Sequence, residues 1–262
     1  MAQTALITGA SSGIGLELAK VFARNRYNLI LVARSEEKLQ ALQSELAGQY
    51  GIQAVVLSHD LTDREAPTRL FDQVQQQNLT VDVLVNNAGY GDYAEFVSSD
   101  WQKLEGMILL NVLAATHMTR LFLPAMVAQG SGKVLNVSST AAFQPGPMMA
   151  VYFATKAYLL SFSEAIAAET DGTGVGVTVL CPGPTQSNFI GKANMDKMAL
   201  ANNLTEEAIP TAAEVAEFGY AALQKGEVVA VHGLSNKLLT FSTRLVPRGL
   251  LRKGVKQFMA SE

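Results

Sequence analysis

The chain has little of what disulfides, metal clusters and membrane spans require. Its 262 residues include one cysteine, Cys181, and three histidines, which excludes an internal disulfide and a thiolate metal cluster. No apolar run approaches the roughly 18 residues of a membrane span, and the first residues lack the positive charge of a signal peptide. The net charge of −3 means that the chain lacks the excess of positive charge typical of nucleic-acid-binding proteins. We expect a soluble, cytoplasmic protein without a metal site or a nucleic-acid partner.

What the chain does have is an alternation of short apolar stretches and helical patterns. The stretches are continuously apolar, as in Leu29–Val32, which is typical of strands buried on both faces of a sheet. Strand–helix alternation predicts an α/β fold with a doubly wound parallel sheet of about seven strands and helices on both faces. No linker interrupts it, so we expect one domain over 1–262. The expected strands are Thr4–Thr8, Asn28–Val32, Gln53–Ser58, Val81–Asn86, Gly132–Val137, Gly176–Leu180 and Val228–His232.

A glycine-rich turn follows the first expected strand. Gly9, Gly13 and Gly15 admit unusual backbone angles and a close approach of ligand, and the helix that follows directs its first amides outward. This pattern favours a bound dinucleotide diphosphate, with Ser11, Ser12 and Ile14 as further contacts. A tight connection with no ligand remains the alternative.

The end of the second expected strand indicates which dinucleotide is bound. A carboxylate is expected there for a ribose 2′-hydroxyl, but the chain has Ala33 and Arg34. A guanidinium matches a 2′-phosphate instead, and Ser12 could add a hydroxyl donor. We therefore predict NADP(H); the alternative is that Arg34 is only a solvated residue.

Two further strand ends lie where ligands bind in such sheets. Asp60 and Leu61 follow the third expected strand, and Asn87, Ala88 and Gly89 follow the fourth. We predict that all five contact the cofactor. For Asp60, a role in capping or turn formation alone stays open.

A phenol and an ammonium lie four residues apart on one predicted helix, at Tyr152 and Lys156. The ammonium is expected to lower the pKa of the phenol, which suits acid–base work. Ser139 closes the fifth expected strand, where its hydroxyl can bind a substrate carbonyl. Asn111 lies among apolar residues of a helix and needs a partner if it is buried.

Taken together, these motifs resemble those of the short-chain dehydrogenase/reductase family. The pattern TGxxxGxG matches Thr8–Gly15 and NNAG matches Asn86–Gly89. The family's active-site Asn, Ser, Tyr and Lys match Asn111, Ser139, Tyr152 and Lys156. The similarity extends over about residues 2–232 in order and spacing, and it implies a Rossmann-type fold.

The resemblance also implies roles for these residues. Tyr152 is then the general acid in carbonyl reduction, and Lys156 lowers its pKa and binds the nicotinamide ribose. Ser139 orients the carbonyl, and Asn111 holds a proton-relay water. Pro182 and Gly183 match the family's proline-glycine pair, and Thr185 or Ser187 takes the part of the threonine that often follows; the sequence leaves open which one.

The segments that flank the predicted site are apolar. We expect Phe143, Met148, Met149 and, in a substrate loop over 183–210, Phe189 to contact the substrate. No basic residue lies between Phe143 and Tyr152, which favours a hydrophobic ketone or aldehyde, with an acyl or steroid-like body as candidates. Packing of the loop onto the protein is the alternative for each residue.

The last segment, 233–262, is basic. From Asn236 onward its net charge is +5, against −8 for the rest of the chain. It is either an amphipathic segment for an anionic membrane or, as we prefer, a helical extension packed on the body with a solvated basic face. The resemblance further implies a homodimer or homotetramer.

The sequence thus predicts an NADPH-dependent oxidoreductase that reduces the carbonyl of a small hydrophobic substrate to an alcohol. One alternative is a 3-oxoacyl (acyl-carrier or CoA) or steroid-like ketoreductase at a membrane surface. Another, of a different class, is a non-catalytic NADP(H)-binding sensor or scaffold.

Overall fold

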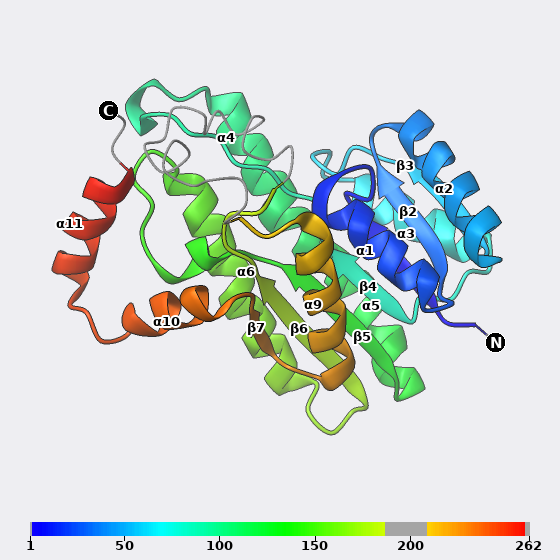
Figure 1. The fold of residues 1–262 in the computed structure, drawn as a ribbon. Helices are drawn as coiled ribbons and strands as arrows, with labels where there is room; N and C mark the ends of the chain where they lie inside the picture. Colours follow the sequence, from blue (N-terminus) through cyan, green and yellow to red (C-terminus); the bar gives the residue numbers. More distant parts are fainter. Residues whose placement is uncertain (1, 187–208, 260–262) are drawn as a thin grey trace.

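The computed structural model describes residues 2–186 and 209–259, which contain a seven-stranded parallel sheet (Figure 1). Its strand order is β3-β2-β1-β4-β5-β6-β7. The doubly wound α/β fold predicted from the sequence is confirmed. The strands are β1 (Thr4–Thr8), β2 (Asn28–Ala33), β3 (Ala54–Ser58), β4 (Val83–Asn86), β5 (Gly132–Val137), β6 (Val175–Cys181) and β7 (Val229–Val231).

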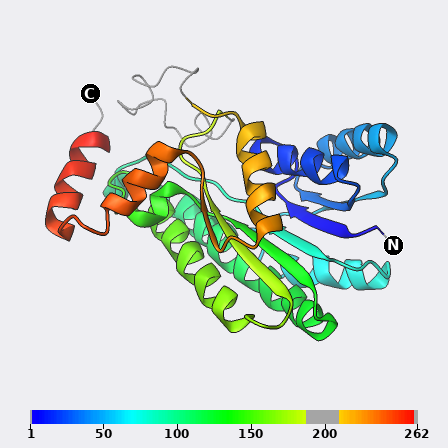
Figure 2. The same cartoon turned by 60° about the horizontal axis from the view of Figure 1, so that its bottom comes forward.

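Helices cover both faces of this sheet, which is why its central strands are apolar throughout. Figure 2 shows the two layers from a second direction. The first layer consists of α1 (Gly13–Arg24), α2 (Glu36–Tyr50) and α9 (Ala212–Lys225). The second consists of α3 (Ala66–Gln76), α5 (Ala115–Gln129) and α6 (Ala150–Glu169).

The strand order reverses at β1, which pairs with β2 on one side and with β4 on the other. Ile7 of β1 is aligned with Leu31 of β2 and with Val85 of β4. Ligands of open α/β sheets bind at the carboxyl ends of the strands at such a switch point. The turn after Thr8 and the segment after Asn86 therefore meet at this edge.

One long helical run crosses the second layer and changes its winding on the way. It comprises α4 (Trp101–Ile108), a π-helical stretch η2 (Leu109–Ala114) and α5. Single π-turns within α-helices occur frequently at functional sites, and this one contains Asn111.

The same run corrects the expectation that no segment could span a membrane. By length and composition alone, Trp101–Gln129 would qualify. Met118, Phe122 and Met126 of this run lie in the core, and α5 packs on β4 and β5. These contacts are those of a helix that covers a sheet.

Buried polar side chains link the central strands to the second layer. Asn86 on β4 donates to the side-chain oxygen of Asn136 on β5 at 2.9 Å, and Asn136 donates to Ser163 on α6 at 2.9 Å. Buried amides of this kind are stable only when they are paired, so this chain fixes the alignment of β4, β5 and α6.

Beyond β7 the chain forms two helices, α10 (Leu234–Ser242) and α11 (Arg248–Met259). They lie at the end of the molecule opposite the N-terminus (Figures 1 and 2). On its inner side α11 packs Val255 and Met259 against a cluster that includes Tyr152. The predicted extension beyond the last strand is thus helical and in part packed on the body.

Candidate active site

The glycine-rich turn is closed against the end of β4. Gly9 and Gly13 have φ of +69° and +58°, a region that favours glycine. A Cβ on Gly15 would lie 2.3 Å from the Gly9 carbonyl oxygen and 2.3 Å from the Asn87 amide nitrogen. Only a glycine fits there, so the turn and Asn87 are locked together.

Thr8 ties the same two segments with its side chain. Its hydroxyl donates to the Val85 carbonyl at 3.2 Å and accepts from the backbone amides of Asn87 and Ala88, both at 3.0 Å. Asn87 in return donates to the Thr8 carbonyl at 2.9 Å. Asn87 and Ala88 are therefore held beside the glycine-rich turn. This proximity is required if all of them contact the same cofactor.

The start of α1 fits a bound diphosphate. Ser12 is the N-cap residue of α1, and its side-chain hydroxyl accepts no hydrogen bond from the first backbone amides of the helix. These amides are therefore available to a ligand. Ser11, Ser12 and Ile14 are all partly exposed here. The helix N-terminus and these amides favour an anion at the switch point of the sheet, which is the chemistry an NADP(H) diphosphate requires.

Arg34 and Asp60 lie together at the neighbouring strand ends. The Arg34 side chain is 77% exposed, and its Nη1 lies 3.8 Å from Oδ2 of Asp60. Asp60 also accepts bonds from the amide and hydroxyl of Thr62, at 3.0 and 2.8 Å, so it does form a turn. Leu61 differs from the other predicted contacts, because its side chain packs in the core under β2.

Tyr152 and Lys156 lie near the start of α6 and are both buried. The Lys156 Nζ lies 5.7 Å from the centre of the Tyr152 ring and donates to the Val137 carbonyl at 2.8 Å. Ser138 supports the helix from β5, since its hydroxyl donates to the Lys156 carbonyl at 2.8 Å. The predicted phenol–ammonium pair is therefore brought together at the end of β5.

Ser139 lies on the same edge and contacts the phenol. Its proximity acts to lower the pKa of Tyr152, and its Oγ accepts from the Ala141 amide at 3.1 Å. Ser139 also approaches Pro182, to whose carbonyl it donates at 3.4 Å. The Ser139 hydroxyl and the Tyr152 phenol thus lie at the same edge of the sheet, where both could contact one carbonyl oxygen.

Pro182 and Gly183 follow β6 at this edge. Thr185 is buried, and its hydroxyl donates to the Gly183 carbonyl at 3.0 Å. Ser187 and Phe189, like most of the predicted loop over 183–210, lie outside the described residues. The choice between Thr185 and Ser187 therefore stays a prediction.

Asn111 is buried with all its polar groups in use. Its Oδ1 accepts from the Tyr90 amide at 3.1 Å, while Nδ2 donates to the Tyr90 carbonyl at 2.9 Å and to Thr155 at 3.1 Å. A Cβ on Gly89 would lie 3.0 Å from Asn111 Oδ1 and 3.4 Å from Lys156 Nζ. Asn111 and Lys156 thus meet at Gly89.

Burial controls the pKa values of the central pair. It raises the pKa of Tyr152 to about 12, with the Ser139 hydrogen bond acting in the opposite direction. It also lowers the pKa of Lys156 to about 8, which the nearby Cys181 opposes. The expected lowering of the Tyr152 pKa is wrong for the protein alone, because desolvation of the buried phenol outweighs the opposing effect of Ser139. A protonated phenol is nevertheless the form that donates a proton.

An apolar cluster surrounds Tyr152 and contains residues that the sequence did not indicate. Met149 and partly buried Met148, which are predicted to contact the substrate, belong to it, and so do Tyr93 and two residues of α11. The Tyr93 hydroxyl donates to the Met259 carbonyl at 2.8 Å and thereby holds α11 in place. The spacing of Leu251, Val255 and Met259 would have indicated an inward helix face, but not its target.

Phe143 lies elsewhere, which corrects its predicted place near the substrate. It packs with Val179, Cys181 and Val231, toward β7 and α10. Its position at the end of the 3₁₀ helix η3 (Thr140–Phe143) turns the ring away from the Tyr152 cluster. Within the described residues no group of three or more His, Cys, Asp or Glu side chains could hold a metal.

Comparison with known proteins places this geometry in context. A family model described as short chain dehydrogenase matches residues 3–198. A very-long-chain 3-oxoacyl-CoA reductase from Anas platyrhynchos is 34% identical over 201 residues, which cover 74% of this chain and 64% of that protein. A ketoacyl reductase, HetN, from Nostoc sp. is 33% identical over 181 residues, which cover 69% of this chain and 63% of that protein. The chain thus spans less than two thirds of the length of these relatives.

Solved structures agree over nearly the whole chain. A short-chain dehydrogenase from Sphingobium yanoikuyae in complex with NADPH has a TM-score of 0.82 and 30% identity, with 95% of each chain covered. A 7beta-hydroxysteroid dehydrogenase has a TM-score of 0.85 and 26% identity, with 97% of this chain and 96% of that chain covered. The chain belongs to the short-chain dehydrogenase/reductase family.

Proposed function

We propose that this protein is an NADPH-dependent reductase that converts the carbonyl of a hydrophobic ketone or aldehyde to an alcohol. One observation carries the proposal: the buried, protonated phenol of Tyr152 lies beside Ser139 at the edge of the sheet where the glycine-rich turn lies. A proton donor and a carbonyl-binding hydroxyl beside a dinucleotide site suit carbonyl reduction.

The cofactor assignment rests on Arg34. Its guanidinium is largely exposed at the end of β2, where it can form charge-assisted bonds with a 2′-phosphate. Asp60 at 3.8 Å is bound to Thr62 and turned toward Arg34. The Sphingobium neighbour was solved with NADPH, which supports the same choice here.

The chain's own residues would act in the following way. When bound, the nicotinamide supplies a hydride to the carbonyl carbon. Tyr152 donates its phenolic proton to the carbonyl oxygen, and the Ser139 hydroxyl orients that oxygen. Lys156 places a positive charge near the phenol, which favours the phenolate left behind, and Asn111 fixes the backbone at Tyr90, next to Gly89.

The surroundings of Tyr152 favour an apolar substrate. Tyr93, Met149 and Phe153 pack with it, and Val255 and Met259 of α11 complete the cluster. The names of two relatives, a 3-oxoacyl-CoA reductase and a ketoacyl reductase, make 3-oxoacyl thioesters the first compounds to test. Steroid ketones come next, since one structural neighbour is a hydroxysteroid dehydrogenase.

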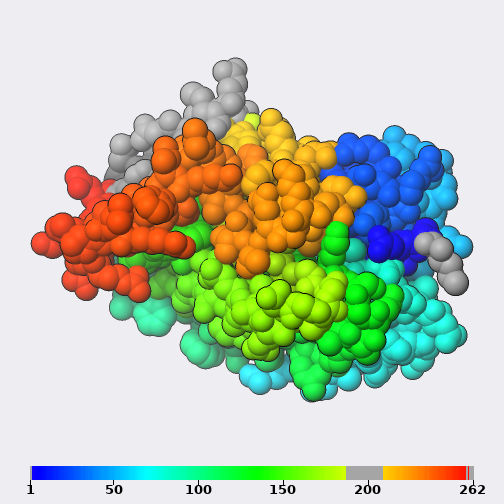
Figure 3. Space-filling model, turned by 90° about the horizontal axis from the view of Figure 1, so that it is seen from below, coloured from blue at the N-terminus to red at the C-terminus, as the bar shows by residue number. Residues whose placement is uncertain are grey.

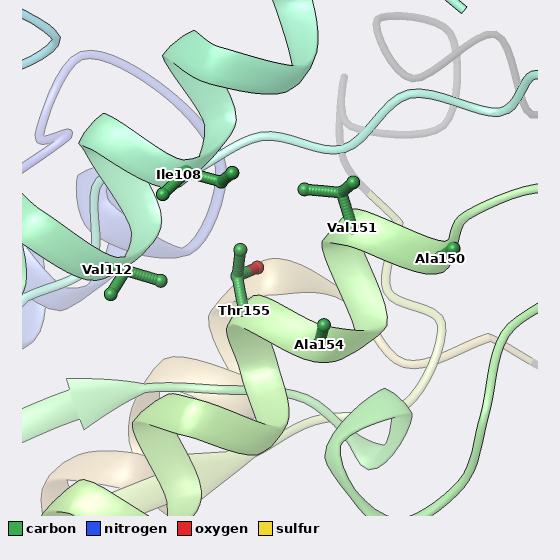
Figure 4. Close-up of a pocket in the computed structure, with 6 residues that line it drawn as sticks. All are labelled: Ile108, Val112, Ala150, Val151, Ala154 and Thr155. Carbon is green, nitrogen blue, oxygen red and sulfur yellow. The ribbon is translucent and has the colours of Figure 1, made fainter. Parts of the chain in front are cut away.

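We also propose that two copies associate across α4–η2 and α6. An apolar hollow of about 330 Å³ lies between these segments, and Figure 4 shows the side chains that line it. Nearby Ile108, Leu113 and Tyr158 are exposed, although they are apolar or aromatic. Light scattering should give a dimer or tetramer mass, and Leu113→Glu should reduce that mass by half.

The test of the activity follows NADPH consumption with 3-oxoacyl thioesters of increasing chain length, steroid ketones and aryl ketones. We expect turnover with at least one apolar class and none in the Tyr152→Phe variant. Tight NADPH binding without turnover of any compound in the panel would favour a non-catalytic sensor. Failure to bind NADPH or NADH would contradict both.

A further inference from the structure

The segment from Leu234 to Met259, here called the tail, is positively charged throughout. It contains no acidic residue and six basic ones, Lys237, Arg244, Arg248, Arg252, Lys253 and Lys256. All six are exposed, and none forms an ion pair with an acid in the described part of the chain. Apart from Lys237, whose Nζ lies 5.8 Å from the centre of the Phe218 ring, these charges are available to a partner.

The tail also exposes large apolar side chains. Leu238 is 63% exposed, Phe241 58% and Leu245 72%. Exposed apolar residues are common singly, but a group of them on one segment marks an interaction site. Among the side chains that the structure describes, this group comprises Leu234, Leu238, Leu239, Phe241, Leu245, Val246 and Leu250.

The basic and the exposed apolar side chains of the tail are distributed differently over α10 and α11. In α11 the apolar residues Val255 and Met259 are buried against the Tyr152 cluster, so its basic residues remain on the surface. In α10 the buried residue is Thr240, and the leucines and Phe241 are the exposed ones. Figure 3 shows the tail as one continuous end of the molecule.

A hollow beside α10 also combines apolar and basic side chains. It has a volume of about 230 Å³ and apolar walls formed by Phe143, Val229 and Phe241. Lys237 and Arg244 also line it. An acyl chain with an anionic head group would match both the apolar walls and the two basic residues.

We propose that the tail binds the surface of an anionic lipid bilayer, with the α10 leucines and Phe241 inserted among the lipids and the basic residues of α11 on the head groups. Interfacial segments combine apolar insertion with electrostatic attraction in this way. A symmetric contact between two copies would instead place like charges opposite each other. This proposal is independent of the reductase activity.

The test uses the full chain with vesicles of phosphatidylcholine alone or mixed with phosphatidylglycerol. Sedimentation should show binding to the anionic vesicles at low salt, and little binding to the neutral ones or at high salt. The triple variant R248Q/R252Q/K253Q should bind about a hundredfold more weakly, since each basic residue contributes substantially near an anionic surface.

Two matched controls separate the tail from general charge and hydrophobicity. The variant K38Q/R64Q/K225Q removes three exposed charges elsewhere and should keep wild-type binding. Phe241→Ser should weaken binding severalfold, whereas Phe96→Ser, at an equally exposed phenylalanine, should not. Thermal unfolding confirms that each variant is folded.

Absence of binding to anionic vesicles at low salt would overturn the proposal. So would equal losses in the two triple variants. A wild-type dimer that dissociates in R248Q/R252Q/K253Q, without vesicle binding, would assign the tail to a second copy of the chain instead.

Discussion

The Lys156 ammonium donates a hydrogen bond of 2.8 Å to the Val137 carbonyl, which holds a cation at the end of β5. Burial lowers its pKa to about 8, while the pKa of Tyr152 stays at about 12. As pH rises from about 7 to about 9, the protonated fraction of Lys156 falls about tenfold and Tyr152 keeps its proton. We expect kcat/KM for carbonyl reduction to fall about tenfold over this range. A flat profile up to about pH 10 would contradict a charged Lys156 in the reaction.

Tyr152→Phe removes the proposed proton donor but leaves the ring packing intact. We expect turnover to fall by about a hundredfold to ten-thousandfold, with NADPH affinity nearly unchanged. The matched control is Tyr158→Phe, six residues on in the same helix, whose hydroxyl contacts only Thr116 among the described residues. Stopped-flow reduction and fluorescence titration of NADPH measure the two quantities. Equal activity in the two variants would exclude Tyr152 as the acid.

Arg34→Asp replaces the proposed 2′-phosphate ligand by a repelling charge. NADPH affinity should fall by roughly a hundredfold, because a charge-assisted hydrogen bond is lost and a carboxylate is added. NADH affinity should change little. Lys38→Asp, an exposed site on the adjoining helix α2, controls for net charge. Equal losses for both cofactors would refute the assignment.

Gly15→Ala places a methyl group 2.3 Å from the Gly9 carbonyl oxygen, a backbone atom that cannot move aside freely. We expect a stability loss of about 1–3 kcal/mol and weak cofactor binding, as is typical of overpacking. Gly48→Ala, on α2, meets no atom within 4 Å and should instead stabilise the protein by up to about 1 kcal/mol. Urea unfolding of both variants tests this contrast, and a neutral Gly15→Ala would disprove the tight closure.

Tyr93→Phe removes the hydrogen bond that holds α11 on the Tyr152 cluster. The free energy of unfolding should fall by about 1 kcal/mol. KM should rise more for bulky ketones than for small ones, because α11 borders the cluster. Tyr50→Phe serves as the control, and equal KM values for both substrate sizes would show that α11 does not shape the site.

The strands of the sheet were predictable because each is a short, continuous apolar stretch flanked by glycine or polar residues. β1 and β5 have the predicted bounds; β2, β3 and β4 differ by one or two residues at one end, and β6 and β7 by one residue at each end. Motif spacing also places the glycine-rich turn, Asn87 and Ser139 at carboxyl ends of strands, and parallel pairing brings these strand ends to one edge. Tyr152 and Lys156 reach the same edge from helix α6.

Long-range packing was not predictable from these patterns. Nothing around Phe143 distinguishes a ring that faces β7 from one that faces Tyr152. The π-turn at Asn111 depends on tertiary contacts with Tyr90 and Thr155, and not on helix propensity. The pKa of Tyr152 was predicted in the wrong direction because complete burial cannot be read from the spacing of Tyr152 and Lys156.

The bond between Tyr93 and Met259 joins positions 166 residues apart. Contacts between such distant positions carry a large loop-closure cost and form only after the intervening structure is in place. During synthesis the cluster around Tyr152 therefore stays incomplete until the chain has been made through Met259. We expect a ribosome-bound chain stalled before α11 to bind dinucleotide before it can bind a bulky ketone.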